Sequence, residues 1–427
     1  MHQPLAVIVL AAGLGKRTKV GIPKVLLPLC GRTLIGSVLD TVAELQPERT
    51  VVVLHHGKQE VEKTLLGRKD LTIVDQGEPR GTGHAVQVAM AALPGFSGDV
   101  VVVYGDCPLI TADTLRALRD ARGSLPGGAR AAILTAFPDD PTGLGRILRG
   151  KNGELLAIKE HKDCDEEELE IDEINAGFYC FDGRHLGKVL STLRADNAQK
   201  ELYLTDTIAA FRAEKAQVTT FTVDDPSEIQ GVNALHDLAI ARGLMQERIH
   251  LRHLANGVII EDPSSTFIDH DVKIGRNTRI LPCTVIRSGV VVGEHCEVGP
   301  FAHLRQDTVL EDGAEIGNFV ETKKTHVGAG TKAKHLTYLG DTTIGKKVNV
   351  GAGTITANYD GKLKHHTRIE DGAFIGSGTV LVAPSRIGKN AMTGAGAIVK
   401  RGSEIPDGEV WVGVPAKKIA KPKEGTR

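Results

Sequence analysis

The stretch "VVVGEHCEVGPFAHLRQDTVLEDGAEIG", residues 290–317, decides the fold of the second half of the chain. Aliphatic side chains recur in it every six residues, at Val292, Val298, Leu304, Leu310 and Ile316. This spacing matches neither the alternation of an ordinary strand nor the period of an α-helix. It is typical of a left-handed parallel β-helix, in which three hexapeptides make one coil and the aliphatic side chains stack inside.

The repeat continues on both sides of this stretch. Further aliphatic residues in the series are Ile268, Ile274, Ile280, Ala333, Leu339, Ile344, Val350, Ile369, Ile375, Leu381 and Ile387. At about 18 residues per coil, about 130 residues predict roughly seven coils. We therefore expect a β-helix domain over residues 257–427.

Two polar stretches stand out within the repeat. "TKAKHLTYLGDTTIG" (331–345) keeps the series with one step of five residues, so we expect His335 and Tyr338 to point outward. "ITANYDGKLKHH" (355–366) lacks the hexad and predicts a loop. A loop leaving a solenoid often lies on the binding face, although a surface loop without a role has the same composition. We expect this loop to fold towards His335 of its own or of a neighbouring chain.

The first half of the chain follows a different pattern. Apolar runs such as "LAVIVLAAG" (5–13) and "DVVVVYGDCPLI" (99–110) alternate with helical segments such as "TADTLRALRDAR" (111–122), for which Thr111 or Asp113 is the expected N-cap. Residues 1–233 therefore predict an α/β Rossmann-like domain, with a parallel sheet covered on both faces. Residues 234–256 predict a linker helix between the two domains.

Composition excludes several classes of protein. The net charge is −1 over 427 residues, which offers no electrostatic attraction for nucleic acid or a membrane surface. The six cysteines form no C-x-x-C pair, as expected for the reduced cytoplasm. The apolar N-terminal run lacks a preceding basic region, so we interpret it as a buried strand and not as a signal peptide. No apolar run approaches the roughly 18 residues of a membrane-spanning helix.

Two motifs of the first half indicate phosphate chemistry. In "LAAGLGKRTKVGIPK" (10–24), glycines follow a strand and would let backbone N–H groups approach a phosphate that Arg17 and Lys24 neutralise. The spacing differs from both the dinucleotide fingerprint and the P-loop, and a tight turn with a solvated basic tail is the alternative. Asp106 ends an apolar strand, where a carboxylate either binds a divalent cation such as Mg²⁺ or caps the following turn. Ligands bind at the carboxyl ends of such strands, so we expect both motifs on one rim.

Several motifs in order resemble one enzyme family. The first half contains "QGEPRGTGHA", "YGDCPL", "DPTGLGRI", "IKEHKD", "EINAG", "ELYLTD" and "EIQGVN", and the second contains "FAHLRQD", "FVETKKTHVG", "KHLTYLGD", "VNVGAGTITANYDG" and "FIGSGTVLVAP". Together they resemble the bifunctional N-acetylglucosamine-1-phosphate uridylyltransferase / glucosamine-1-phosphate N-acetyltransferase family over nearly the whole chain. The resemblance implies a cytoplasmic homotrimer that makes UDP-N-acetylglucosamine for peptidoglycan and lipopolysaccharide. Its substrates would be UTP, sugar-1-phosphates and acetyl-CoA, with Mg²⁺ as cofactor and no nucleic acid or membrane partner.

The resemblance also assigns residues to a uridylyl site. Positions that would bind nucleotide, phosphate or sugar are Leu10, Ala11, Ala12, Gly13, Arg17, Lys24, Gln76, Gly81, Thr82, Tyr104, Gly105, Asp106, Gly145, Glu160, Asn175 and Asn233. Among them, Gln76, Gly81 and Thr82 match the residues that read uracil. Asp106 and Asn233 match the ligands of Mg²⁺.

For acetyl transfer, the resemblance makes His335 the general base. The other matching positions are Arg305, Lys323, Tyr338, Asn349, Ala352, Asn358, Tyr359, Ser377 and Ala395. A histidine suits the base role because the amine that attacks a thioester must lose a proton near neutral pH. One position departs from the family, since Gly413 stands where an Arg contacts CoA phosphates. Lys417 and Lys418 could replace that contact.

Two other classes of protein remain compatible with these patterns. One is a sugar-1-phosphate nucleotidylyltransferase whose β-helix serves only for assembly. The other is a non-catalytic trimer that binds or regulates. The ordered set of polar residues in the second half favours the bifunctional enzyme over both.

Overall fold

The computed structural model describes residues 3–13 and 15–420, which divide into two compact units. One unit extends to Leu244 and the other begins at Met245, so the division lies within helix α8 (Leu235–Ala255). A helix was predicted over residues 234–256, and α8 confirms that this part of the chain is helical. The expected domain limits at 233 and 257 stay predictions, and each unit is described by itself.

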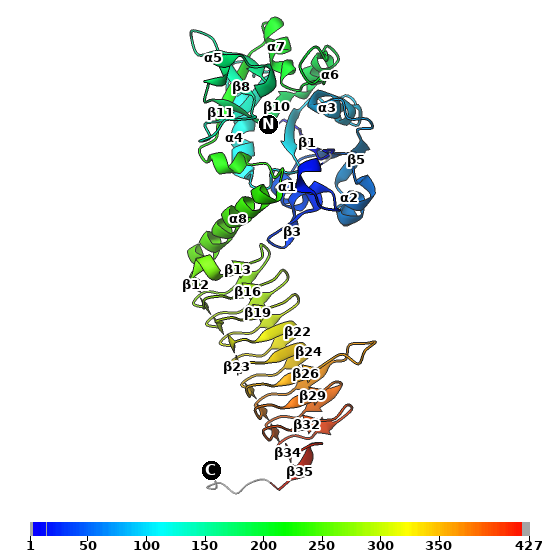
Figure 1. The fold of residues 1–427 in the computed structure, drawn as a ribbon, viewed down its shortest axis with the longest axis vertical. Helices are drawn as coiled ribbons and strands as arrows, with labels where there is room; N and C mark the ends of the chain where they lie inside the picture. The colour runs from blue at the N-terminus through cyan, green and yellow to red at the C-terminus, as the bar shows by residue number, and fades with distance from the viewer. Residues whose placement is uncertain (1–2, 14, 421–427) are drawn as a thin grey trace. The chain divides into compact units, whose positions relative to one another are not determined.

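The first unit contains a nine-stranded sheet (Figure 1). Its strands are β1 (Leu5–Leu10), β4 (Arg49–Leu54), β5 (Leu71–Asp75), β6 (Asp99–Tyr104), β7 (Ala131–Ala136), β8 (Arg146–Arg149), β9 (Leu155–Lys159), β10 (Ile174–Asp182) and β11 (Val218–Thr222). The order is β11-β7-β10-β6-β1-β4-β5, with the β8–β9 hairpin beside β10. The expected parallel pairing is confirmed for β1, β4, β5 and β6, whereas β10 runs antiparallel to β6 and β7. A hairpin and short turns precede β10 in place of a helical crossover, so the chain returns in the opposite direction.

Helices cover both faces of this sheet. Their bounds are α1 (Leu34–Ala43), α2 (Lys58–Leu65), α3 (Thr82–Ala91), α4 (Ala112–Gly123), α5 (Glu166–Leu169), α6 (Gly183–Leu190) and α7 (Asp206–Ala213). Short elements are η1 (Lys16–Thr18), η2 (Lys24–Leu26), η3 (His161–Asp163), η4 (Pro226–Ile229) and the strand pair β2 (Pro28–Leu29) and β3 (Arg32–Thr33). Alternate residues of β1 point to opposite faces, so Val7 and Val9 pack with α1, α2 and α4, and Ala6 and Ile8 pack with α3, α6 and α7. Of the two predicted N-caps, Thr111 and not Asp113 caps α4, by accepting a hydrogen bond from the N–H of Thr114.

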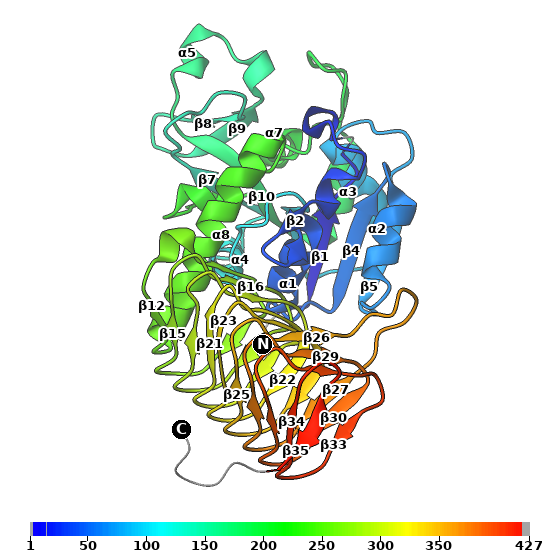
Figure 2. The same cartoon turned by 60° about the horizontal axis from the view of Figure 1, so that its bottom comes forward.

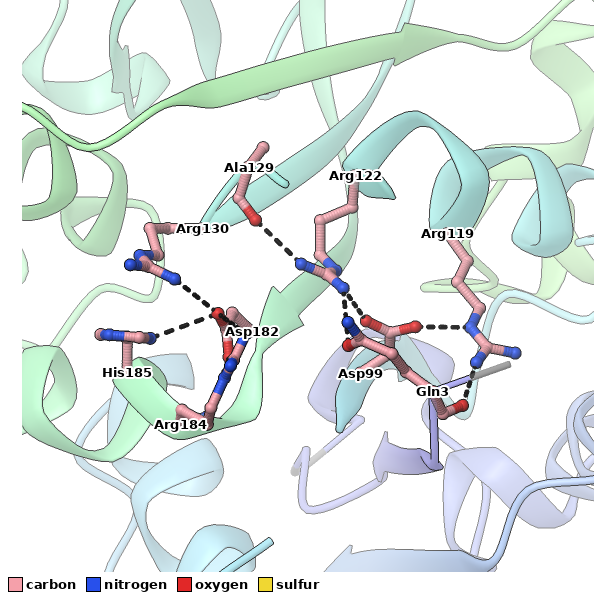
Figure 3. Close-up of polar contacts among 9 residues, drawn as sticks. All are labelled: Gln3, Asp99, Arg119, Arg122, Ala129, Arg130, Asp182, Arg184 and His185. Carbon is pink, nitrogen blue, oxygen red and sulfur yellow. Dashed lines mark hydrogen bonds and ion pairs between the residues drawn. The ribbon is translucent and has the colours of Figure 1, made fainter. Parts of the chain in front are cut away.

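Two buried carboxylates lie where β6 begins and β10 ends, and they contact side chains of the neighbouring segments (Figure 3). Asp99, the first residue of β6, pairs in register with Asp182, the last residue of β10. Asp99 contacts Arg119 and Arg122 of α4, and Asp182 contacts Arg130, Arg184 and His185. A buried carboxylate requires such partners, because an unpaired charge is costly to bury.

The second unit is a parallel β-helix with three ladders of short strands (Figures 1 and 2). The first ladder has β12 (Ile259–Ile260), β15 (Arg279–Ile280), β18 (Glu297–Val298), β21 (Glu315–Asn318), β23 (Lys332–His335), β25 (Asn349–Val350), β28 (Phe374–Ile375), β31 (Met392–Thr393), β34 (Val410–Val412) and the antiparallel β35 (Lys417–Ile419). The second has β13 (Phe267–Ile268), β16 (Val285–Ile286), β19 (His303–Leu304), β22 (Glu321–Val327), β24 (Tyr338–Ile344), β26 (Ile355–Ala357), β29 (Val380–Val382) and β32 (Ile398–Val399). The third has β14 (Lys273–Ile274), β17 (Val291–Val292), β20 (Val309–Leu310), the later halves of β22 and β24, β27 (Thr367–Ile369), β30 (Ser385–Ile387) and β33 (Glu404–Ile405). A 3₁₀ turn, η5 (Pro263–Ser265), lies in the first coil.

Every aliphatic residue predicted to face inward is buried, which confirms the register of the repeat. The β-helix has about eight coils and not seven, because its strands begin before the first residue of the predicted aliphatic series and continue after the last one. Three inward positions hold threonine, at Thr322, Thr356 and Thr393. Their hydroxyl groups are hydrogen-bonded within the coil, as buried polar groups must be.

The loop observed between β26 and β27 is shorter than the one predicted over residues 355–366. Residues 355–357 form β26, and Thr356 occupies an inward position, so the excursion from the coil covers residues 358–366. Figure 1 shows this segment projecting from the side of the β-helix between β26 and β27. Across residues 3–13 and 15–420, no helix has both the length and the apolar character of a membrane span.

Candidate active sites

A cavity of about 270 Å³ opens at the carboxyl ends of β1 and β6. Ten of the residues predicted to bind nucleotide or sugar line it: Leu10, Ala11, Ala12, Gly13, Lys24, Gln76, Gly81, Thr82, Tyr104 and Asp106. The backbone brings the two strand ends together, because the N–H of Gly105 donates to the carbonyl of Leu10 at 2.9 Å. Glycine suits position 105, because a Cβ there would lie only 3.1 Å from the Cβ of Ala11. The expectation that both motifs share one rim is therefore confirmed.

Lys24 and the two predicted metal ligands meet at one point. The Nζ of Lys24 contacts Oδ2 of Asp106 and lies 3.1 Å from Oδ1 of Asn233. Since both oxygens converge on this ammonium, they can also converge on a metal cation, and oxygen ligands of this kind suit Mg²⁺. Among the described residues, no group of three or more His, Cys, Asp or Glu side chains could hold a metal. A cation here would therefore take its other ligands from phosphate and water.

Tyr104 and Glu160, both predicted to contact the sugar, lie in a more enclosed environment. The side chain of Tyr104 lies over Gly177, where an added Cβ would be 2.8 Å from the ring. Burial, reinforced by Glu160, raises the pKa of Tyr104 well above its usual range, so its hydroxyl stays a neutral hydrogen-bonding group. Burial also raises the pKa of Glu160, although a hydrogen bond from Thr205 opposes this shift. A desolvated carboxyl group of this kind is suited to bind a sugar hydroxyl or amide.

Several predicted residues of this site do not line the first cavity. The N–H of Asn175 donates to the carbonyl of Gly145 at 2.8 Å, which joins two predicted sugar contacts. Asn175 and Asn233 both line a second hollow of about 930 Å³. Arg17 lies exposed on η1 and does not line the first cavity. Four further residues line that cavity without having been predicted as site residues: Val25, Pro79, Ala85 and Glu201. Pro79 and Ala85 lie within "QGEPRGTGHA" and Glu201 within "ELYLTD", so these motifs were the signal that could have found them.

In the second unit, the second ladder carries a cluster of cations on its outer face. Lys323 pairs in register with Gly340 of the next coil, and Arg305 lies at the equivalent position of the preceding coil. The ammonium group of Lys364 lowers the pKa of Lys323, and Arg305 adds to this effect. Lys364 comes from the projecting loop and was not predicted; its place in "ITANYDGKLKHH" was the only signal available. Arg305 is paired with Glu321 at 2.6 Å, so the positive charge that favours an anion such as phosphate comes mainly from Lys323 and Lys364.

Tyr338 and Asn358 lie beside this cluster. A Cβ at Gly340 would lie 2.4 Å from the hydroxyl of Tyr338 and 2.8 Å from the side-chain nitrogen of Asn358. Both side chains therefore reach across the glycine, and Asn358 is held there by Asp341. The missing side chain of Gly340 therefore leaves the space that the Tyr338 hydroxyl and the Asn358 amide occupy.

His335 lies at the corner between the first and second ladders, exposed to solvent as predicted. The carbonyl of His335 accepts from the N–H of Gly353, at 3.4 Å. In the next coils, Ala352 and Ser377 accept in the same manner from Gly378 and Gly396, at 2.7 and 2.8 Å. These bonds stack the turns, so that His335, Ala352, Ser377 and Ala395 form a column along one corner.

Two predicted residues lie apart from this column. Asn349 belongs to the first ladder, hence to another face of the β-helix. Tyr359 is exposed on the loop and donates to the carbonyl of Gly361. Within the described residues, the loop forms hydrogen bonds or ion pairs with Asp341, Thr343 and Arg401 but none with His335.

At the far end of the column, Gly413 has a φ of 89°, a backbone conformation that residues other than glycine rarely adopt. An Arg at this position would therefore be strained. Lys418 lies 2.7 Å from Glu409, whereas Lys417 makes no ion pair with any residue that the structure describes. Lys417 is the freer of the two predicted substitutes for the missing Arg.

Comparison with known proteins separates the two units clearly. The MobA-like NTP transferase domain family matches residues 7–166, and the bacterial transferase hexapeptide family matches residues 366–401. The chain is 44% identical to the bifunctional protein GlmU of Thermobifida fusca, covering 96% of this chain and 92% of the relative. It is 41% identical to that of Shouchella clausii (92% and 93% covered) and 40% identical to that of Synechococcus sp. CC9311 (98% and 97%).

The chain belongs to the GlmU family. Both family matches fall on transferase domains, one in each unit, so the chain is a bifunctional transferase with a nucleotidyltransferase domain and a hexapeptide acyltransferase domain. The resemblance found in the sequence is thereby confirmed, as is the fold class.

Proposed function

We propose that the chain makes UDP-N-acetylglucosamine in two steps. The second unit transfers an acetyl group from acetyl-CoA to glucosamine-1-phosphate. The first unit then transfers a uridylyl group from UTP to N-acetylglucosamine-1-phosphate and releases pyrophosphate. The observation that carries this proposal is that each unit has its own polar site, built from residues far apart in the sequence.

For uridylyl transfer, an oxygen of the sugar phosphate attacks the α-phosphorus of UTP, and the bond to pyrophosphate breaks. Such reactions depend on positioning and charge neutralisation. Lys24 and Arg17 supply positive charge for the triphosphate, and Asp106 with Asn233 would hold Mg²⁺, which supplies further charge when bound. Burial and the adjacent carboxylate raise the pKa of Cys107, so its thiol stays protonated and is no nucleophile.

For acetyl transfer, the amine nitrogen attacks the thioester carbonyl, and His335 accepts the proton that the amine loses. The bond between the acetyl carbon and sulfur then breaks, and the thiol leaves with a proton. The N–H of Ala352 is available for the developing oxyanion, because those of Gly351 and Gly353 already donate to carbonyls. Arg305, Lys323 and Lys364 would bind the sugar phosphate, and the column of Ser377 and Ala395 would guide acetyl-CoA.

We further infer that the acetyl site is completed by a second copy of the chain in a homotrimer. Asn349 lies on a different face from Tyr338, and the exposed Tyr359 hydroxyl donates within its own loop, so we infer that a neighbouring copy supplies both side chains. An apolar ridge next to His335 supports this arrangement: Phe301, Phe319 and Leu336 are 50, 57 and 64% exposed, and the two rings stack at 5.1 Å. Exposed apolar ridges of this kind are typical of protein interfaces.

The test is a coupled assay. Purified protein is given glucosamine-1-phosphate, acetyl-CoA, UTP and Mg²⁺, and the products are identified by mass. We expect UDP-N-acetylglucosamine, CoA and pyrophosphate as the products. A product that forms only from N-acetylglucosamine-1-phosphate would instead indicate a single-activity nucleotidylyltransferase with a structural β-helix.

Two variants separate the sites. His335→Ala should abolish acetyl transfer and leave uridylyl transfer intact, whereas Asp106→Ala should do the reverse. If His335→Ala lost both activities, unfolding would be the explanation. If Asp106→Ala kept full uridylyl transfer, its assignment as a metal ligand would be wrong.

A further inference from the structure

The side-chain amide of Gln76 is held from two sides. Gln76 follows β5 and is 6% exposed in the nucleotide cavity. Its Nε2 lies 3.1 Å from the carbonyl oxygen of Gly81 and 3.4 Å from Nδ1 of His84. A carbonyl oxygen can only accept, so the nitrogen of the amide, and not its oxygen, must face Gly81.

His84 can accept a hydrogen bond from the second hydrogen of the Gln76 amide. Its side chain belongs to α3 and is 8% exposed. Burial, with Arg80 adding to it, lowers the pKa of His84, so the imidazole is neutral at pH 7. A neutral imidazole with its proton on Nε2 offers Nδ1 as an acceptor. Both hydrogens of the Gln76 amide are then engaged, and its Oε1 is the group left to face the nucleobase.

We propose that His84 is a positioning residue that fixes the Gln76 amide and thereby makes the cavity select uracil over cytosine. This inference rests on the proposed function of the first unit. The N3 position of uracil carries a hydrogen that can be donated to Oε1, whereas N3 of cytosine carries a lone pair. Two acceptors facing each other in a buried site leave both unpaired, which corresponds to about 10- to 100-fold in selectivity.

The test compares kcat/KM for UTP and CTP in three proteins. His84→Leu removes the acceptor at nearly constant size, and His84→Asn keeps an acceptor oxygen close to the position of Nδ1. We expect the UTP preference to fall about 10-fold or more in His84→Leu and to stay within about 3-fold of wild type in His84→Asn. The preference for UTP over dUTP, which reports the ribose, should not change in either variant.

An unchanged UTP preference in His84→Leu would overturn the inference, and so would an equal fall in both variants. ¹⁵N NMR of histidine-labelled wild-type protein gives a second measurement that needs no variant. The inference requires the tautomer with hydrogen on Nε2, and a hydrogen on Nδ1 of His84 would overturn it. If the wild type transferred no uridylyl group, the proposed function would fail, which is a distinct outcome from a loss of selectivity in one variant.

Discussion

Asp182→Asn tests how the first unit holds the strand that carries Asn175. Asp182 ends β10, and Asn175, near the other end of the strand, lines the second hollow. Its carboxylate lies 2.7 Å from Arg130 and 3.0 Å from Arg184, and also accepts from the backbone N–H of Arg184 as the N-cap of α6 (Figure 3). Its side chain is only 2% exposed. Burial opposes its charge, but the hydrogen bonds and charge of Arg184, with Arg130, prevail and lower the pKa of Asp182 to about 2.

The magnitude follows from this pKa. A carboxyl group with an ordinary pKa of 3.8 that falls to about 2 on folding contributes about 2 kcal/mol to the free energy of unfolding, at ~1.4 kcal/mol per pKa unit. Asparagine keeps the N-cap and the approximate shape, so the loss reflects the charge. Because folding lowers the pKa, the contribution is present above pH 3.8 and disappears as the pH falls through about 2.

Urea unfolding provides the assay, because the two units have separate probes. Far-UV circular dichroism at helical wavelengths reports mainly the first unit, which holds α1 to α7, and the fluorescence of Trp411, the only tryptophan, reports the second. At pH 7 the helical midpoint should fall by about 1 M urea in Asp182→Asn, while the Trp411 transition stays in place. An unchanged helical midpoint would refute the reasoning. An equal difference between wild type and variant at pH 7 and pH 2 would refute the role of the charge.

Three further predictions concern the sites. Lys24→Met should bind Mn²⁺ about tenfold more tightly in calorimetry without nucleotide, because the competing ammonium is gone; unchanged or weaker binding would contradict this. Lys364→Met should raise KM for glucosamine-1-phosphate several-fold by removing a cation beside Lys323, with uridylyl kinetics as the internal control; an unaltered KM would exclude its role. Lys417→Ala should raise KM for acetyl-CoA, whereas Lys418→Ala should not, since Lys418 is held by a carboxylate; equal effects, or none, would remove Lys417 from the CoA site.

The sequence by itself determined the fold class of both halves. Local patterns are sufficient where a residue's environment depends on its own position in a repeat, as the inward aliphatic series shows. The same reasoning found the N-cap Thr111, the helix α8 and the ordered motifs that identify the family. It missed the threonines at inward positions, because polar residues are not expected inside the coil. Their burial is possible only because their hydroxyl groups form hydrogen bonds there.

Only the tertiary structure decided which side chains meet. Lys24 and Asn233 are 209 positions apart in the chain, and no spacing rule predicts that their side chains lie 3.1 Å apart. The antiparallel direction of β10, the approach of Lys364 to Lys323 and the place of Asn349 on a separate face are likewise set by chain direction, loop path and ladder register. These are properties of packing between distant segments, whereas periodicity describes only how neighbours in sequence share a face.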